Sequence, residues 1–290
     1  MKYLIVTLIQ LSIFAKINIL TTTTDISWLV KAIGGERVKV TSLLSGTEDP
    51  HYVDAMPHWI SKTSRADIIC LVGLELEVAW LPKILKRSGN KKIQKGSKGY
   101  CNIGSAINSL EKVESPDRSM GDVHSGGNPH YHLSPKYFLQ GASKVIDVLI
   151  ENDSKGADIY LKNFEVLKRD MASLQKEVRS ILKTKNKMSF MSYHKEFSYF
   201  VEEFKLNYVG EVEETPGVPP SAGRIARIGL FAKNKNVDLA IATKNNPEKI
   251  MKKFQEISGV PYKLVDISIN DKGAKSYRDL ILQLAKAFTL

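Results

Sequence analysis

The sequence predicts an α/β protein with mostly parallel sheets, built as two lobes that are joined by one long helix. Short β-branched runs alternate with longer segments of helical period, which is the pattern of β–α–β units. The strand-like runs also fall into two sets, and an uninterrupted helical stretch lies between them. A chain of 290 residues suits either one large domain or two lobes of about a hundred residues each.

The order of elements follows from the apolar period along the chain. Runs rich in Val and Ile predict strands, and stretches with apolar residues every three or four positions predict helices. The predicted strands are residues 17–20, 38–43, 68–72, 100–103, 188–192, 207–212, 239–242 and 262–265. The predicted helices are residues 26–33, 60–65, 76–87, 135–150, 157–183, 221–233, 247–258 and 277–288.

One predicted helix is longer than the others. Between residues 157 and 183 the apolar residues recur in alternating steps of four and three, which gives a single apolar stripe over about seven turns. Such a helix could lie on the surface of one domain, but its central position favours a rigid connection between two lobes. The expected organisation is a signal peptide (1–15), an N-terminal lobe (16–154), a linking helix (155–183) and a C-terminal lobe (184–290).

The first residues favour export to the periplasm. Met1 and Lys2 precede an apolar stretch from Tyr3 to Ala15, which is too short to span a bilayer but suits the core of a signal peptide. A buried first strand is the alternative. Neither cysteine directly follows this stretch, so no N-terminal lipid anchor is expected. Cys70 and Cys101 could form a disulfide in an oxidising compartment or remain buried thiols.

The net charge of +11 comes from lysines that are interleaved with acids along the whole chain. Because there is no arginine-rich run and no aromatic RNA-binding signature, the charge indicates a solvated basic surface and no nucleic-acid partner.

Three of the six histidines occupy similar places, at or just past a strand-like run where a loop begins. They are His51, His130 and His194. In open α/β sheets, ligands collect at the carboxyl ends of the strands, so residues far apart in sequence can converge there. Three imidazoles with one carboxylate suit Zn²⁺ or Mn²⁺. Taken singly, each histidine could equally serve in a loop or core, so spacing alone leaves the metal site open.

Three sequence motifs around these histidines, in the same order along the chain, resemble those of a known protein family. The first runs from Leu43-Leu44-Ser45-Gly46 to Glu48-Asp49-Pro50-His51, the second is Gly127-Asn128-Pro129-His130, and the third is Tyr193-His194 with Phe197 downstream. Together they resemble the ligand segments of the zinc- and manganese-specific solute-binding proteins of ABC importers, and the likeness covers nearly the whole chain.

The resemblance implies two (β/α) lobes, a long rigid helix and a metal ion in the cleft between the lobes. His51 and His130 would come from the first lobe, and His194 and a carboxylate from the second. Asp266, just past the last predicted strand, matches the family's aspartate ligand, although it could instead cap a helix or turn. The implied role is that of a monomeric carrier, not an enzyme, which takes up Zn²⁺ and delivers it to a cognate ABC permease in the inner membrane.

Several features depart from the family pattern or leave alternatives. Asn245-Asn246 stands where relatives often have an acidic residue, which favours zinc over manganese as the cargo. His132 is expected to point away from His130 in an extended segment, and His124 and His58 are expected to be solvated. Glu196 is interpreted as a surface helix residue. The rival function is a zinc hydrolase with a three-histidine site, but the sequence contains no His-Glu-x-x-His motif.

Overall fold

The computed structural model describes residues 15–115, 117, 120–121, 123–183 and 188–288. The predicted signal peptide lies outside these residues apart from Ala15. Within the described part of the chain, no helix combines the length and the apolar character that a membrane crossing needs.

Within the described residues, eight strands form two parallel sheets of four strands each, and every predicted strand is confirmed. The first sheet has the order β2-β1-β3-β4 and the second has the order β6-β5-β7-β8, so both sheets place their strands in the same way. The strands are β1 (Ile17–Thr21), β2 (Val38–Ser42), β3 (Ile68–Leu71), β4 (Tyr100–Asn102), β5 (Ser189–Ser192), β6 (Asn207–Glu211), β7 (Leu239–Thr243) and β8 (Tyr262–Val265).

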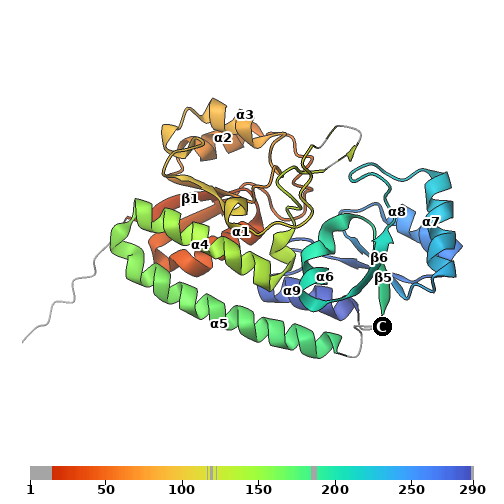
Figure 1. The fold of residues 1–290 in the computed structure, drawn as a ribbon. Helices are drawn as coiled ribbons and strands as arrows, with labels where there is room; N and C mark the ends of the chain where they lie inside the picture. The colour runs from red at the N-terminus through yellow and green to blue at the C-terminus, as the bar shows by residue number, and fades with distance from the viewer. Residues whose placement is uncertain (1–14, 116, 118–119, 122, 184–187, 289–290) are drawn as a thin grey trace, which may run out of the picture.

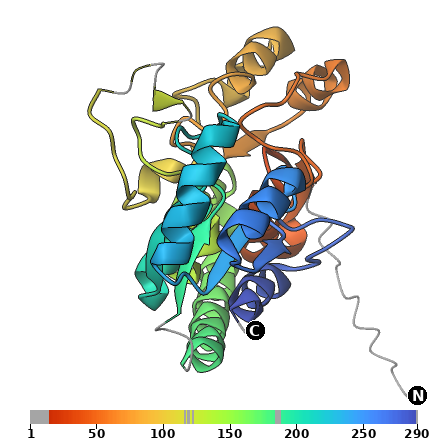
Figure 2. The ribbon, with the colours of Figure 1, turned by 90° about the vertical axis from the view of Figure 1, so that its right-hand side faces the viewer.

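Helices cover the sheets, which is why the central strands are buried on both faces. Figure 2, turned to face the second lobe, shows α7 and α8 packed side by side on its outer face. The α-helices of the described residues are α1 (Thr24–Gly34), α2 (Pro57–Ser64), α3 (Leu81–Ser88), α4 (Pro135–Asn152), α5 (Ala157–Leu182), α6 (Ser198–Phe204), α7 (Ala222–Asn234), α8 (Glu248–Ser258) and α9 (Tyr277–Ala287).

The predicted helix over residues 76–87 starts later than expected. Leu74 and Glu75 have positive φ angles of 52° and 69°, so the chain turns here and α3 begins at Leu81. The buried carboxylate of Glu77 accepts hydrogen bonds from the backbone N–H groups of Val72 and Gly73, at 2.7 and 3.0 Å. These bonds hold residues 74–80 as turns. The short helix α6 was not predicted.

Helix α5 runs beneath both halves of the molecule (Figure 1). Its 26 residues give a length of about 39 Å. Its apolar stripe packs on α1 and α4 of the first half and on α9 of the second half. The predicted stripe is confirmed except at its end. There Leu182 is buried, whereas Ile181, the last predicted residue of the stripe, is only partly buried. The boundaries between lobes and linking helix at residues 154 and 183 stay a prediction.

The two halves share buried contacts beyond α5. Tyr277 of α9 packs against Trp28 of α1 and Phe138 of α4, with ring centroids 4.9 and 4.8 Å apart. Glu203 of α6 is buried and accepts hydrogen bonds from the Ser134 side chain and from Gln175 of α5. Because these contacts cross between the halves, any movement of one lobe against the other must disturb buried groups.

The two cysteines lie opposite each other in the first sheet. Cys70 of β3 and Cys101 of β4 are neighbours in the strand register, and both are buried free thiols. The sequence left open whether these cysteines form a disulfide or remain buried thiols, and in the structure they are buried thiols.

The end of α4 is held by one acidic residue. Asp153 accepts hydrogen bonds from Arg37 at 2.6 and 2.7 Å and from the Tyr160 hydroxyl at 2.5 Å. The hydrogen bond from Arg37 is the main cause that lowers the pKa of Asp153 below its ordinary value. The carboxylate therefore stabilises the junction of α4 and α5 only while it is ionised.

We expect the Asp153→Asn variant to lose about 2 kcal/mol of unfolding free energy at pH 7, because it loses a charge-assisted bidentate pair. A lowered native pKa adds stability above the unfolded pKa of about 3.9, and that stability is lost as the pH falls through the native value. Urea unfolding at pH 7 and at pH 3 should therefore show the difference between variant and wild type shrinking at low pH. An undiminished difference at pH 3 would contradict this account.

Candidate metal centre

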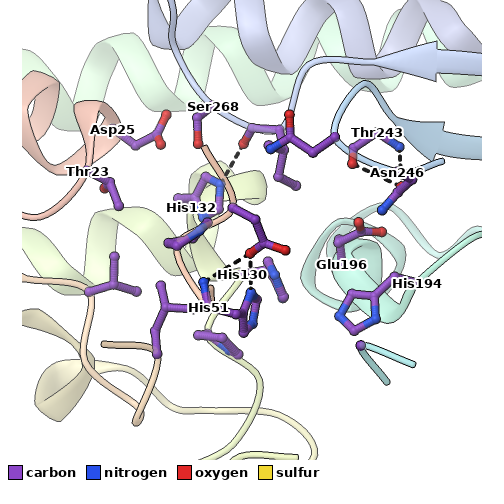
Figure 3. A pocket seen from close by; sticks show the side chains of 18 of the residues that line it. Thr23, Asp25, His51, His130, His132, His194, Glu196, Thr243, Asn246 and Ser268 are labelled. Atoms are coloured by element: carbon purple, nitrogen blue, oxygen red, sulfur yellow. Dashed lines mark hydrogen bonds and ion pairs between the residues drawn. The ribbon is translucent and has the colours of Figure 1, made fainter. Parts of the chain in front are cut away.

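Three histidines from distant parts of the chain meet around one cavity. His51 lies in the loop after β2, His130 lies just before the 3-10 turn η5 (Tyr131–Leu133), and His194 lies two residues after the end of β5. The ring centroids are 5.5 Å apart for His51 and His130, 5.7 Å for His130 and His194, and 6.2 Å for His51 and His194. Figure 3 shows His51 and His130 on one side of the cavity and His194 on the other.

The sequence prediction of their placement is only partly right. His194 lies two residues after the end of its strand, whereas His130 comes at the end of a long loop that leads from β4 into η5 and α4. One of the three histidines therefore lies at the carboxyl end of a strand, and loops carry the other two.

His51 and His130 are held by the same local arrangement. In Asp49-Pro50-His51, the Asp49 Oδ1 accepts from the backbone N–H of His51 at 3.0 Å and lies 2.8 Å from its Nδ1. In Asn128-Pro129-His130, the Asn128 Oδ1 makes the same two contacts at 2.9 and 2.8 Å. Each turn thus holds both the backbone and the ring of its histidine. The repeated pattern of Asp or Asn, then Pro, then His was visible in the sequence, but its function was not recognised.

His194 is oriented by Glu213, which lies in the connection between β6 and α7. Its Nδ1 lies 2.8 Å from the Glu213 Oε2, and the same oxygen accepts from the backbone N–H of Gly217 at 3.2 Å. The segment between β6 and α7 therefore orients His194. It also caps α7, because the Ser221 hydroxyl accepts from the backbone N–H of Arg224.

These contacts determine which ring nitrogen faces the cavity. An acceptor oxygen beside Nδ1 requires the proton on Nδ1, so the lone pair of a neutral ring lies on Nε2. The Nε2 of His51 is buried and has no hydrogen-bond partner. Burial is the main cause that lowers the pKa of His130 well below its ordinary value, and neighbouring histidines add to it. A neutral, oriented imidazole is the form that binds a metal ion.

The cavity fits a small cation in size and in donor chemistry. Its volume is about 80 Å³. Imidazoles bound to one tetrahedral ion through bonds of about 2.1 Å would have ring centroids about 5 Å apart. The observed spacings are somewhat larger, and among the described residues no three His, Cys, Asp or Glu side chains are yet close enough to hold a metal ion. Binding therefore requires the rings to approach one another by roughly 0.5–1 Å.

Asp266, the carboxylate that the sequence assigned to the site, makes other contacts. Its two oxygens accept from Lys244 Nζ, both at 3.0 Å, and from the backbone N–H of Ala274 at 3.2 Å. The Asn270 amide also donates to it at 3.2 Å. The side chain is 5% exposed, and it is not one of the residues that line the cavity. In this structure Asp266 is thus apart from the three histidines.

Glu196 lines the cavity instead, contrary to its interpretation as a surface residue. It lies in the 3-10 turn η7 (Lys195–Phe197), two residues after His194, and it is 4% exposed. Burial is the main cause that raises its pKa. The sequence placed Glu196 within the third motif, but its surroundings include Asn246 of the connection after β7, which a local pattern cannot show.

The remaining histidines differ in their surroundings. His132 does not point away from the cavity as predicted, because η5 is a 3-10 turn and not an extended segment. Its ring lines the cavity, and its Nε2 lies 2.8 Å from the backbone oxygen of Ile267. The ring of His124 lies 5.3 Å from that of His51, so this residue is close to the centre. His58 is exposed at the start of α2, as predicted.

Comparison with known proteins identifies the family. Residues 19–289 match the family described as the periplasmic component A of zinc-uptake complexes, ZnuA. The chain belongs to this family. The recognition from the three histidine motifs is therefore confirmed, and because the family consists of substrate-binding proteins of ABC transporters, this member is not an enzyme and the hydrolase alternative is not favoured.

Curated relatives of this ZnuA-family chain are named for different metals. The metal ABC transporter substrate-binding lipoprotein SloC of Streptococcus mutans is 25% identical over 269 residues, which cover 89% of this chain and 83% of SloC. The manganese-binding lipoprotein MntA of Halalkalibacterium halodurans is 23% identical, over 91% of this chain and 85% of MntA. The zinc-binding lipoprotein AdcA of Streptococcus pneumoniae is 23% identical, over 84% of this chain but only 48% of AdcA.

Solved structures share the fold. A crystal structure of ZnuA superposes with a TM-score of 0.77 at 24% identity, covering 94% of this chain and all of the other. The substrate-binding protein FpvC of Pseudomonas aeruginosa, in complex with Mn²⁺, gives a TM-score of 0.79 at 18% identity, covering 95% of this chain and 99% of FpvC. The predicted fold of two α/β lobes joined by a long helix is confirmed.

The relatives do not support one expectation from the sequence. SloC, MntA and AdcA are all named lipoproteins, so the expected absence of a lipid anchor gains no support from them.

We expect the Asp49→Ala variant to bind metal about 10- to 100-fold more weakly, because it loses the acceptor that orients His51. Asp49→Asn keeps an acceptor oxygen and should lose less. Asp54→Ala, which removes an exposed aspartate from the same loop, is the matched control. Competition with a chromogenic chelator measures the affinities, and equal affinities for Asp49→Ala and Asp54→Ala would contradict the orienting role.

Proposed function

We propose that this chain takes up a divalent transition metal, preferably Zn²⁺, and delivers it to the permease of an ABC importer. One observation carries the proposal: the Nδ1 atoms of His51, His130 and His194 each lie beside an oxygen acceptor, so each neutral ring has its lone pair on Nε2, and all three residues line one cavity. The metal is the cargo, and no bond of a substrate is made or broken.

The donor set favours zinc over manganese. Three imidazole nitrogens form a borderline-soft site, whereas Mn²⁺ sites contain more oxygen ligands. The amides of Asn245 and Asn246 line the cavity where an acidic residue would have supplied oxygen ligands of higher charge. Manganese and iron are the alternative cargoes, because relatives are named for them.

Delivery requires the ligands to separate. His51 and His130 lie in the first lobe and His194 in the second, so a permease that moves the lobes apart would also pull the ligand set apart. The shared buried contacts of Tyr277 and Glu203 limit this movement to a small one. We propose a periplasmic, monomeric carrier with the signal peptide at residues 1–15. Attachment to the membrane through a lipid is the alternative, because relatives are named lipoproteins.

The fourth ligand proposed from the sequence is Asp266. For this carboxylate to reach the metal it would have to leave Lys244, Asn270 and the backbone of Ala274. Binding by Asp266 is therefore coupled to a rearrangement of the loop after β8.

Metal analysis tests the proposal. We expect the purified mature chain to bind one Zn²⁺ per molecule, and His51→Ala to weaken binding about a hundredfold or more, beyond the loss from an outer partner. His58→Ala is the matched control, because His58 is exposed and is not one of the residues that line the cavity. Elemental analysis and zinc titration give the stoichiometry and affinity. A wild-type chain without stoichiometric metal, or an unaffected His51→Ala variant, would contradict the proposed function.

A further inference from the structure

Glu111 is a strained residue that joins the two lobes beside the cavity. It lies in the long loop that leads from β4 to η5, and its φ angle of 58° is in the left-handed region that favours glycine. A residue with a side chain keeps such a conformation only where surrounding contacts hold it there. For Glu111 these contacts reach across to the second lobe.

Both carboxylate oxygens of Glu111 have partners. Oε1 accepts from the Ser198 hydroxyl at 2.9 Å and lies 3.2 Å from Lys195 Nζ, and both of these residues belong to the second lobe. Oε2 accepts from the amide nitrogen of Asn128, in the first lobe, at 3.0 Å. The carboxylate thus bridges the lobes, and its contacts with Asn128, Lys195 and Ser198 are called the Glu111 clasp below.

The Glu111 clasp acts on the groups that hold two of the histidines. Asn128 contacts the ring of His130 through its Oδ1, and its amide nitrogen also donates to the backbone oxygen of Lys195 at 2.8 Å. Lys195 is the residue after His194. A movement that opens the clasp therefore also increases the distance between His130 and His194, whose ring centroids are 5.7 Å apart.

On the basis of the proposed function, we propose that Glu111 is a positioning residue, which holds the lobes together around the metal ion and slows its release. Glu111 is not one of the residues that line the cavity of the three histidines. The side chains of Glu111 and Lys195 are 33% and 45% exposed. An ion pair so exposed contributes little to the stability of a fold, so folding alone gives little reason for a strained acidic residue at this position.

Loss of the Glu111 clasp should speed release without changing the ligands. The Tyr199 hydroxyl of the second lobe still donates to the backbone oxygen of Asn128 at 2.6 Å, so the lobes stay joined and the effect is partial. Residues that do not touch a ligand change the coupling between parts of a site by about 3- to 30-fold. The backbone strain adds a second consequence, because glycine adopts a φ angle of 58° freely and should relieve the strain at this position.

The test uses the full mature chain with Glu111→Gly, Glu111→Gln and the control Glu114→Gln, which changes an exposed acid of the same loop. Transfer of Zn²⁺ to a chelator gives the dissociation rate, bound Co²⁺ reports the ligand set through its visible spectrum, and thermal melting of the metal-free form reports stability. We expect Glu111→Gly to release Zn²⁺ about 3- to 30-fold faster, with an unchanged Co²⁺ spectrum and a melting temperature no lower than that of the wild type. Glu111→Gln keeps one acceptor oxygen and should release Zn²⁺ at an intermediate rate.

A double variant tests whether Glu111 acts across the lobes. Ser198→Ala removes one donor of the Glu111 clasp, so it should speed release in the wild-type chain and add little in the Glu111→Gly chain. Equal and independent effects in the two chains would contradict an action through the clasp.

The other outcomes separate the two proposals. Release from Glu111→Gly at the rate of the wild type would overturn the positioning role. Faster release together with a lower melting temperature would also overturn it, because Glu111 would then serve folding. A wild-type chain that binds neither Zn²⁺ nor Co²⁺ would overturn the proposed function, and the role of Glu111 with it.

Discussion

The candidate site depends on one constraint, namely that each of three imidazoles is held through its Nδ1 by an oxygen of a neighbouring side chain. Asp49, Asn128 and Glu213 provide these oxygens, each 2.8 Å from the ring nitrogen. Without these acceptors the rings could rotate or bind through the other nitrogen. The metal ion would then have to order the rings, which would reduce the free energy of binding. The loops around the cavity position these acceptors. The Trp80 indole N–H donates to the backbone oxygen of Pro50, between Asp49 and His51, and the backbone N–H of Gly217 donates to the Glu213 carboxylate.

The second requirement is that ligands from two lobes meet at a nearly constant spacing. Helix α5 and the packing of Tyr277 against Trp28 and Phe138 make the lobes share one core. Asn128 links the lobes at the site itself, because its Oδ1 orients His130 while its Nδ2 donates to the backbone oxygen of Lys195 at 2.8 Å, next to His194. The ring spacings of 5.5 to 6.2 Å fit this picture, as they need only a small adjustment to enclose an ion.

Local patterns predicted much of this molecule. Apolar runs gave all eight strands, and the steps of four and three gave α5, because burial against a sheet or helix imposes its period on the sequence. The failures come from polar contacts that the apolar period does not show. The Glu77 carboxylate holds a turn where α3 was expected to begin, Lys244 pairs with Asp266 across two strand ends, and Glu196 is buried beside Asn246 of the connection after β7. The three histidines were identified by motif and chain order, whereas the contacts of Asp266 with Lys244 and Ala274 could not be seen in a local pattern.

The most direct test of the account is X-ray absorption spectroscopy at the metal edge of the zinc-loaded chain. The account predicts scattering from three imidazole rings at about 2.0–2.1 Å, together with one oxygen and no sulfur. A shell with sulfur, or with fewer than three imidazoles, would contradict it, because the three oriented histidines would then not be the ligands on which the rest of the site depends.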